Sequence, residues 1–106
     1  MEYTPGDHIA AAWLNDDSGS YEWYLGVVEK VTDDSITASY FKKASKDSTR
    51  WNFPEEEMVQ QTCSDQILCK INEIAYQSGN VIRCTISRSQ VEMNNSYLNN
   101  FINNLV

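Results

Sequence analysis

Short segments in which apolar and polar residues alternate, separated by turn signals, fill the first two thirds of this 106-residue chain. In residues 36–41, for example, Ile36, Ala38 and Tyr40 fall on one face, which is the period of a half-buried strand. Gly26, inside the second such segment, predicts a bend or a close backbone approach. The predicted strands cover residues 8–13, 22–31, 36–41, 49–53 and 65–71.

These strands predict a mainly β domain over residues 1–72. Residues 55–59 follow Pro54 and predict one helical turn before the last strand, which is typical of a five-stranded SH3-like barrel. An OB-like barrel is the main alternative. That fold usually has longer strands and a helix between the third and fourth, and the loop at 42–48 is too short for one.

A C-terminal extension is expected over residues 73–106. Alternation over 81–86 predicts a further strand, and residues 90–105 predict an amphipathic helix that begins with a capping box from Ser89 to Glu92. Many asparagines weaken the intrinsic propensity of this helix, so its apolar stripe must pack on the barrel, which we favour, or on a partner. The stripe consists of Val91, Tyr97, Leu98, Phe101, Ile102 and Leu105.

Charge and cysteine content narrow the classes of function. Fifteen acidic and eight basic residues give a net charge of −7, which argues against broad nucleic-acid binding and favours a basic partner. Three cysteines without C-x-x-C spacing and a single histidine predict neither a disulfide framework nor a closed zinc site, and we expect no metal or cofactor. Free thiols fit a reducing, intracellular compartment. Neither a membrane span nor a secretory signal is visible, so we expect no membrane partner.

The sequence offers no catalytic constellation. His8 lies at the start of a strand without a matching nucleophile motif, and the acidic pairs at 16–17 and 33–34 occupy turns, where aspartate is favoured for local hydrogen bonding. A phosphate-binding glycine loop is also missing from the sequence. We therefore expect a binding module rather than an enzyme.

Three strings together resemble a known family. "GDHIAAAW", "YEWYLGVVEKV" and "ITASYF" are similar to the Tudor pattern of a Gly-Asp turn, a strand ending in an aromatic residue, an aromatic pair before a small residue, and a further strand ending in an aromatic residue. The longer series "WYLGVVEKV", "ITASYF", "STRWNFPEEEMV" and "DQILCKI" also resembles a Tudor-like module that ends many transposon-derived animal proteins. The first resemblance is to chromatin-reader modules, which implies a nuclear protein.

The resemblance implies a ligand site at the open end of the barrel. In Tudor readers of methylated lysine or arginine, an aromatic cage holds the cation, and the matching residues are Trp13, Tyr24 and Tyr40. A methylammonium group loses its hydration cheaply and is attracted by aromatic ring faces. Trp23 and Phe41 would replace their neighbours if the register differed by one, Trp51 could form a further wall, and Asp16, Asp17 or Glu22 could supply a carboxylate. The implied function is recognition of a basic, methylated histone-tail peptide.

Other interpretations stay open from the sequence. The same aromatic residues could fill the barrel, since small barrels need large side chains in their core. Two lysines follow the third strand, where readers often carry acidic residues. The basic residues at 42–50 could instead contact nucleic-acid phosphates, and the helix at 90–105 could mediate dimerisation. The candidate phosphate contacts are Lys42, Lys43, Lys46 and Arg50.

Overall fold

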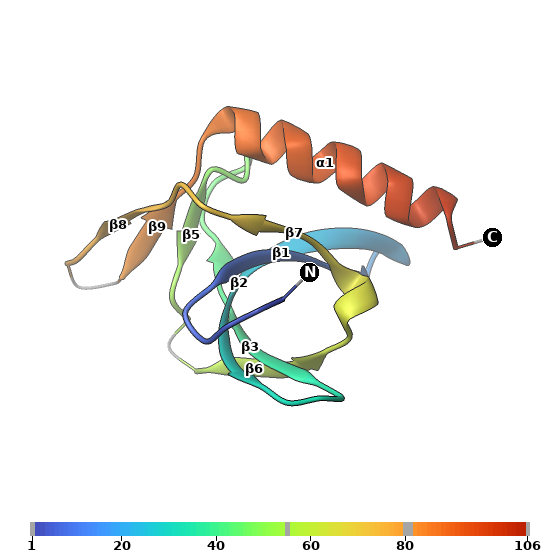
Figure 1. Cartoon of the computed structure of the whole chain (residues 1–106). Coiled ribbons are helices and arrows are strands. Elements are labelled where there is room, and N and C mark those ends of the chain that lie inside the picture. The colour runs from blue at the N-terminus through green and yellow to red at the C-terminus, as the bar shows by residue number, and fades with distance from the viewer. Residues whose placement is uncertain (1, 55, 80–81, 106) are drawn as a thin grey trace.

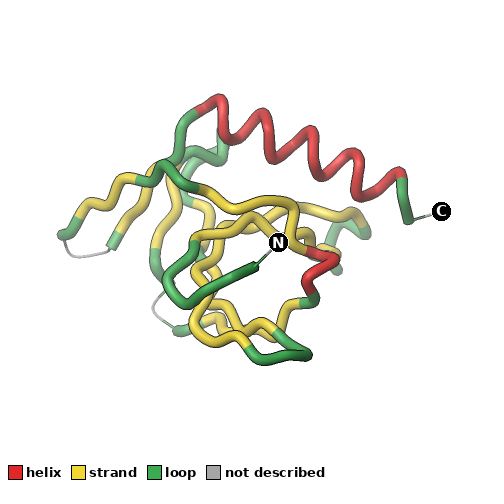
Figure 2. Tube along the Cα trace, in the orientation of Figure 1, coloured by secondary structure: helices red, strands yellow, loops and turns green. Residues whose placement is uncertain are grey.

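The computed structural model describes residues 2–54, 56–79 and 82–105. They form a five-stranded antiparallel sheet, a four-stranded antiparallel sheet and a C-terminal helix (Figures 1 and 2). The elements are β1 (His8–Asn15), β2 (Ser20–Val31), β3 (Ile36–Tyr40), β4 (Lys42–Lys43), β5 (Arg50–Asn52), β6 (Met58–Thr62), the 3-10 turn η1 (Ser64–Gln66), β7 (Ile67–Ile71), β8 (Ala75–Gln77), β9 (Arg83–Thr85) and α1 (Arg88–Asn103). The predicted mainly β class with a C-terminal strand and helix is confirmed.

The five-stranded sheet has the order β6-β3-β2-β1-β7. Its edge strands β6 and β7 follow each other in the chain and are connected through η1, at the lower right of the sheet in Figure 1. Among the described residues these two edges are not paired with each other, so the sheet is open rather than a closed barrel.

The prediction of a helical turn at 55–59 was wrong. Met58 and Val59 are extended and belong to β6, where they pair with Tyr40 and Ser39 of β3; Glu55 lies outside the described residues. The short helix before the last strand of this sheet is instead η1, which directly precedes β7.

The predicted strand at 49–53 is present as β5, but it belongs to the second sheet. That sheet has the order β4-β5-β9-β8, with Trp51 of β5 opposite Cys84 of β9. The predicted strand at 81–86 is β9, and Val81 lies outside the described residues. The sequence did not predict β8. The C-terminal extension therefore shares a sheet with β5.

The five-stranded sheet is covered on both faces near β1, and the side chains of this strand are correspondingly small. Ile9 and the alanines at 10–12 have no exposed surface. Ile9 and Ala11 pack in one apolar cluster with Val28, Ile36 and Tyr40, whereas Ala10 packs in another. Alternation along the strand thus divides its residues between two separate cores.

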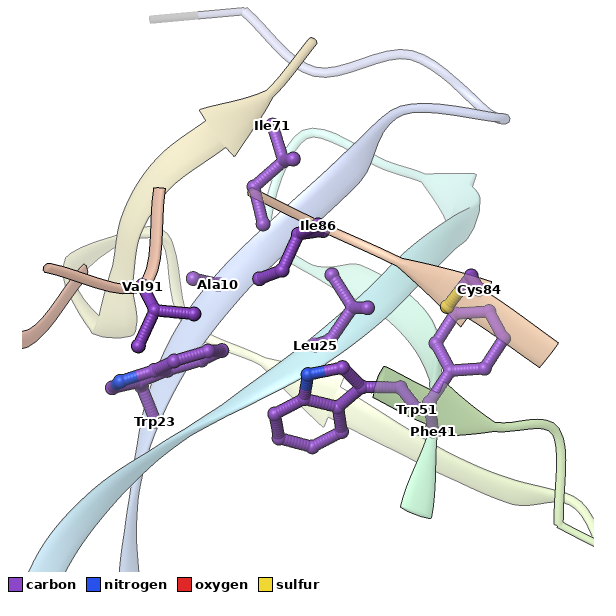
Figure 3. Close-up of a cluster of buried hydrophobic side chains, with 9 residues drawn as sticks. All are labelled: Ala10, Trp23, Leu25, Phe41, Trp51, Ile71, Cys84, Ile86 and Val91. Carbon is purple, nitrogen blue, oxygen red and sulfur yellow. The ribbon is translucent and has the colours of Figure 1, made fainter. Parts of the chain in front are cut away.

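The larger core lies between the two sheets and the helix. Figure 3 shows the indoles of Trp23 and Trp51 next to each other below Leu25, with Val91 of α1 on the side of Trp23 and Cys84 of β9 on the side of Phe41. The two indole rings lie 5.3 Å apart between centroids and are tilted by 39°. Burial of several large rings in one place makes this cluster the main source of apolar stabilisation.

Helix α1 crosses the five-stranded sheet over β7, β1 and β2 (Figure 1). Its N-cap is Ser87, whose hydroxyl accepts a hydrogen bond from Gln90 N–H at 3.0 Å, so the predicted cap at Ser89 was wrong by two residues. Buried Asn94 accepts hydrogen bonds from Gln90 Nε2 and from Cys69 Sγ on β7. The helix is therefore fixed to the sheet by polar contacts as well as by Val91 and its apolar neighbours.

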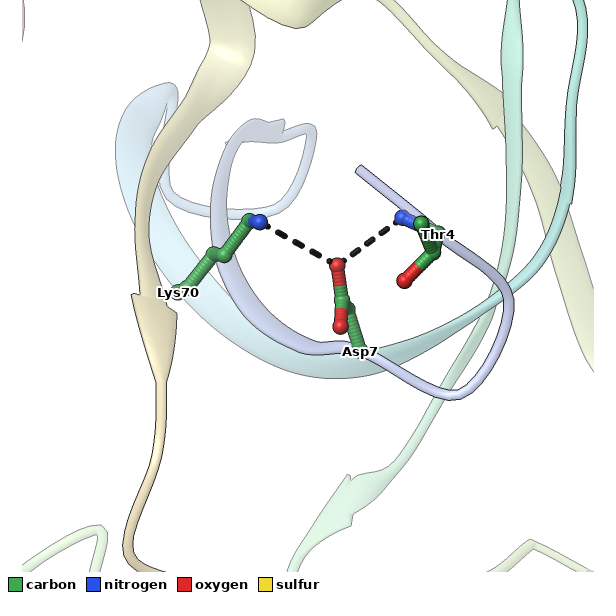
Figure 4. Close-up of polar contacts among 3 residues, drawn as sticks. All are labelled: Thr4, Asp7 and Lys70. Carbon is green, nitrogen blue, oxygen red and sulfur yellow. Dashed lines mark hydrogen bonds and ion pairs between the residues drawn. The ribbon is translucent and has the colours of Figure 1, made fainter. Parts of the chain in front are cut away.

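A carboxylate organises the N-terminal turn. Asp7 Oδ2 accepts a hydrogen bond from Thr4 N–H at 2.9 Å and lies 3.4 Å from Lys70 Nζ (Figure 4). The Thr4 backbone donor, followed by the lysine, holds the pKa of Asp7 below its usual value. This contact connects the residues before β1 to β7, and it lies away from the aromatic residues discussed below.

Candidate functional site

A pocket of about 410 Å³ opens at the end of the five-stranded sheet where β1 leads into β2. It is lined by Trp13, Leu14, Asp16, Tyr24, Tyr40, Met58 and Gln60. The set includes all three residues predicted as the aromatic cage and one of the three predicted carboxylates. These residues come from β1, the following turn, β2, β3 and β6. We call it the aromatic pocket.

Strand register explains why these aromatic residues meet. Side chains directly opposite each other in an antiparallel ladder lie on the same face. Trp13 lies opposite Glu22, Tyr24 opposite Ala11, and Tyr40 opposite both Gly26 and Met58. Side chains one position away in sequence lie on the other face of the sheet. Tyr24 and Tyr40 therefore face the pocket, and their neighbours Trp23 and Phe41 do not.

Tyr40 forms a fixed wall of the pocket. Its ring packs directly on Gly26, where an added Cβ would lie 2.8 Å from Tyr40 Cε1. The close approach predicted at this glycine is therefore a contact with an aromatic side chain. The hydroxyl shares a 2.7 Å hydrogen bond with Thr62 Oγ1, and burial raises the pKa of Tyr40. With 4% of its surface exposed, Tyr40 offers a ligand only a small part of its ring.

Trp13 lies edge-on to Tyr40, with ring centroids 5.7 Å apart and an interplanar angle of 83°. Its side chain is partly exposed. The indole Nε1 of Trp13 is buried and makes no hydrogen bond of standard geometry with the described residues. It lies close to the Tyr40 hydroxyl, and this proximity lowers the pKa of Tyr40, against the larger effect of burial. The contact between these two rings is therefore held by packing rather than by a hydrogen bond.

Carboxylates surround Tyr24. Its hydroxyl donates to Glu22 Oε2 at 3.2 Å, and the same oxygen accepts a hydrogen bond from Asn15 Nδ2. The pKa of Tyr24 is raised, first by burial and then by the negative charges of Glu22 and Asp17. Asp16 lines the pocket directly. The pocket end of the sheet is thus negatively charged, which favours a cationic ligand.

The turn that carries Asp16 is held by local hydrogen bonds. Asn15 Oδ1 accepts from the backbone N–H groups of Asp17 and Ser18, at 2.9 and 3.3 Å. Gly19 has a φ of 70°, a conformation that favours glycine, and its N–H donates to the Asn15 carbonyl at 2.8 Å. Because this turn is built from its own backbone contacts, Asp16 and Asp17 remain exposed and available to a ligand.

Three aromatic residues named as alternative cage members lie elsewhere. Trp23, Phe41 and Trp51 belong to the larger core, with 7%, 3% and 1% of their surfaces exposed. Trp23 Nε1 donates to Asn95 Oδ1 at 2.8 Å and Trp51 Nε1 to the Ser48 carbonyl at 2.7 Å. The structure therefore places these rings among core residues, and none of the three lines the aromatic pocket.

The predicted basic residues lie on the β4–β5 hairpin, and all four are exposed. None of them lines the aromatic pocket. Lys43 instead borders a smaller hollow of about 130 Å³ together with Glu22, Trp23 and Asn95. In the same hairpin, Asp47 accepts hydrogen bonds from Ser45 and Thr49, and these contacts hold its pKa far below the usual value. The two lysines that follow β3 therefore lie outside the aromatic pocket.

Sequence reasoning missed three residues of the pocket: Leu14, Met58 and Gln60. Met58 was missed because residues 55–59 were predicted to form a helical turn, and Gln60 was assigned to no element. Leu14 continues β1 one residue beyond the predicted end of that strand. No period of two marks β6, because Met58 and Val59 are both apolar and Gln60 and Gln61 are both polar, so the local sequence offered no signal for Met58 and Gln60.

His8 lies away from this pocket. Its Nε2 contacts the hydroxyl of Tyr76 on β8, and burial lowers the pKa of the imidazole. No group of three or more histidine, cysteine, aspartate or glutamate side chains in the described ranges is arranged to hold a metal ion. Helix α1 is the longest helix described, and it is too short and too polar to cross a membrane.

Comparison with known proteins finds no match: no family model, no curated protein and no solved structure is significantly similar to this chain.

Proposed function

We propose that this protein is a non-enzymatic reader module that binds a basic peptide through a methylated lysine or arginine side chain. The observation that carries the proposal is the aromatic pocket, in which Trp13, Tyr24 and Tyr40 meet from three different strands beside Asp16. These are the residues that a Tudor-like cage requires. The occupant with the matching chemistry is a histone-tail peptide, which would place the protein in the nucleus.

The physical basis is attraction between a weakly hydrated cation and aromatic rings. Each good contact with a ring face contributes roughly 0.5–2 kcal/mol, and removal of water from the site raises that value. Trp13 and Tyr24 are the partly exposed rings, so they supply most of the contact, while Tyr40 limits the depth of the pocket. Asp16 adds a direct electrostatic attraction at the rim.

The order of the five strands supports a Tudor-like, SH3-like barrel. Strands β1, β2 and β3 form a meander, and η1 leads from β6 into β7, so the two edges of the sheet lie near each other in the chain. The proposal is a Tudor-like arrangement of these strands whose barrel stays open between β6 and β7, the two edges that do not pair within the described part of the chain. The pocket lies where the turn after β1 and the start of β6 approach each other, at one end of the sheet.

Nucleic-acid binding through Lys42, Lys43, Lys46 and Arg50 is the second candidate function, favoured by the exposure of all four on one hairpin. The aromatic residues nearest to them in sequence, Phe41 and Trp51, are buried and cannot stack on bases.

A third candidate is dimerisation through the exposed apolar residues Tyr97 and Ile102 on α1. Sedimentation over a range of concentrations would test it, and a strict monomer would exclude it.

The deciding experiment is a titration with histone-tail peptides that differ only in lysine or arginine methylation, followed by tryptophan fluorescence and calorimetry. We expect methylation to strengthen binding, and Asp16→Asn and Tyr24→Ala to weaken it. Lys42→Ala, on the hairpin, is the matched surface control and should leave it unchanged. A parallel titration with an oligonucleotide tests the second candidate: oligonucleotide binding that weakens with Lys42→Ala and with added salt, without binding of any peptide, would instead favour the nucleic-acid function.

A further inference from the structure

Strand β6 has a free edge beside the aromatic pocket. It is the terminal strand of the five-stranded sheet, and its outer edge has no backbone partner among the described residues. Met58 is 49% and Val59 38% exposed, and Gln60 and Gln61 are also exposed. A free strand edge presents a row of unused hydrogen-bonding groups to any extended chain.

The register identifies which backbone groups are unused. Phe41 N–H donates to the Leu25 carbonyl of β2, so alternate residues of β3, including Ser39, direct their backbone groups towards β2. The backbone groups of Tyr40 and Ala38 consequently point to β6, where they meet Met58 and Gln60. The N–H and C=O groups of the intervening residues, Val59 and Gln61, therefore point outward from the sheet.

The same alternation directs side chains towards the pocket. Met58 and Gln60 line the aromatic pocket together with Tyr40 and are on its face of the sheet. A strand added to β6 would lie about 4.8 Å away, and every second side chain would project on that face. A lysine or arginine side chain on that face would lie beside Met58 and Gln60 and point along the pocket that they line.

Charge indicates which chain would bind. Glu56 and Glu57 precede β6, Asp65 follows it, and Asp16 lies across the pocket. Lysine and arginine are both absent from the strand itself. A second copy of this chain paired antiparallel along β6 would bring Glu57 close to the partner copy's acidic end, which is unfavourable. A basic peptide meets attraction at both ends of the strand.

We propose that the peptide binds as an additional strand along β6, hydrogen-bonded to the backbone of Val59 and Gln61, with its methylated side chain in the aromatic pocket. This inference rests on the proposed function for the occupant of the pocket. The backbone contacts would supply affinity, and the pocket would select the methylated residue.

The test combines backbone-amide hydrogen exchange with two variants of Val59. Addition of a saturating methylated peptide should slow exchange at Val59 and Gln61, whereas Met58 and Gln60 are already protected by β3. Val59→Pro removes one outward N–H, which an edge strand tolerates, and should weaken binding by about tenfold. Val59→Ala keeps that N–H and should leave affinity within about twofold.

The outcomes separate this inference from the proposed function. Methylation-dependent binding without protection at Val59 and Gln61, and unchanged by Val59→Pro, overturns strand addition and leaves the reader function. Binding with that protection but without dependence on methylation overturns the reader function and supports strand addition by a basic peptide. Absence of binding by every methylated and unmodified peptide overturns both.

Discussion

Two groups of aromatic residues, three in each, lie on opposite sides of the five-stranded sheet. The pocket group is Trp13, Tyr24 and Tyr40, and the core group is Trp23, Phe41 and Trp51. Two members of the pocket group are direct sequence neighbours of two in the core group, since Trp23 precedes Tyr24 and Phe41 follows Tyr40. The pleat alone determines which ring is available to a ligand and which stabilises the fold.

The polar atoms of the two groups are used differently. In the core group both indole N–H groups have acceptors within the protein, Asn95 and Ser48. In the pocket group the Trp13 Nε1 makes no such bond with the described residues, and the Tyr24 hydroxyl binds a carboxylate at the rim. We therefore expect substitutions in the core group to change stability, and substitutions in the pocket group to change binding.

The largest expected effect is on stability, from Trp51→Ala. This removes a ring that is 1% exposed and should lower the free energy of unfolding by about 3–5 kcal/mol. Trp13→Ala should cost less, because Trp13 is partly exposed. Urea denaturation followed by circular dichroism measures both. Equal losses for the two variants would show that Trp13 is as much a core residue as Trp51.

Gly26→Ala should have the next largest effect, and it acts on the pocket group. The new methyl group would lie 2.8 Å from Tyr40 Cε1 and 3.2 Å from the Ser39 carbonyl oxygen, so the tyrosine ring must move. Overpacking of this kind costs about 1–3 kcal/mol. Peptide affinity should fall as well, because the wall of the pocket shifts.

Gly79→Ala is the matched control for that experiment, since an added Cβ there meets nothing within 4 Å. It should change neither the denaturation midpoint nor peptide affinity. If Gly26→Ala lowers stability but leaves peptide affinity unchanged, Tyr40 does not contribute to the ligand site.

These contrasts also show how far the sequence could predict the molecule. Alternation identified β1, β2 and β3 and divided their side chains between the two faces, because their large apolar residues recur at every second position between turn signals. It failed at β6, where acidic residues after Pro54 imitate the start of a helix and four of the five strand residues are exposed. It also missed β8, all three residues of which are exposed.

Two further errors arose from information that a local pattern does not contain. The pairing of β5 with β9 brings together residues more than thirty positions apart, such as Trp51 and Cys84, and only tertiary packing determines it. At the start of α1, both Ser87 with Gln90 and Ser89 with Glu92 match a capping box. The structure uses Ser87 as the N-cap, while the side chain of Gln90 donates to Asn94 instead of completing a box. For the site, the resemblance to Tudor readers named three rings that line one pocket in the structure, but it did not supply Met58 and Gln60.

Asn95→Ala tests the hydrogen bond made by one indole N–H of the core group, that of Trp23. It removes the acceptor of Trp23 Nε1 and should lower the free energy of unfolding by about 1 kcal/mol, as expected for loss of one partly buried hydrogen bond. Asn99→Ala is the control, because Asn99 is exposed on the same helix and takes part in no described side-chain hydrogen bond. Equal unfolding midpoints for the two variants would mean that the bond to Trp23 contributes nothing.

Asp16→Asn should have the smallest effect on stability. It tests whether a residue of the pocket lining can change binding without changing the fold. The residue is exposed in a turn held by Asn15 and Gly19, so the variant should unfold within about 0.5 kcal/mol of the parent protein. Binding of a methylated peptide should nevertheless weaken about threefold, because one charge at the rim is lost. Asp34→Asn, in the turn after β2 and outside the pocket lining, keeps the change in net charge the same. If both variants weaken binding equally, the peptide is attracted by the net negative charge of the protein, and Asp16 makes no specific contribution at the pocket.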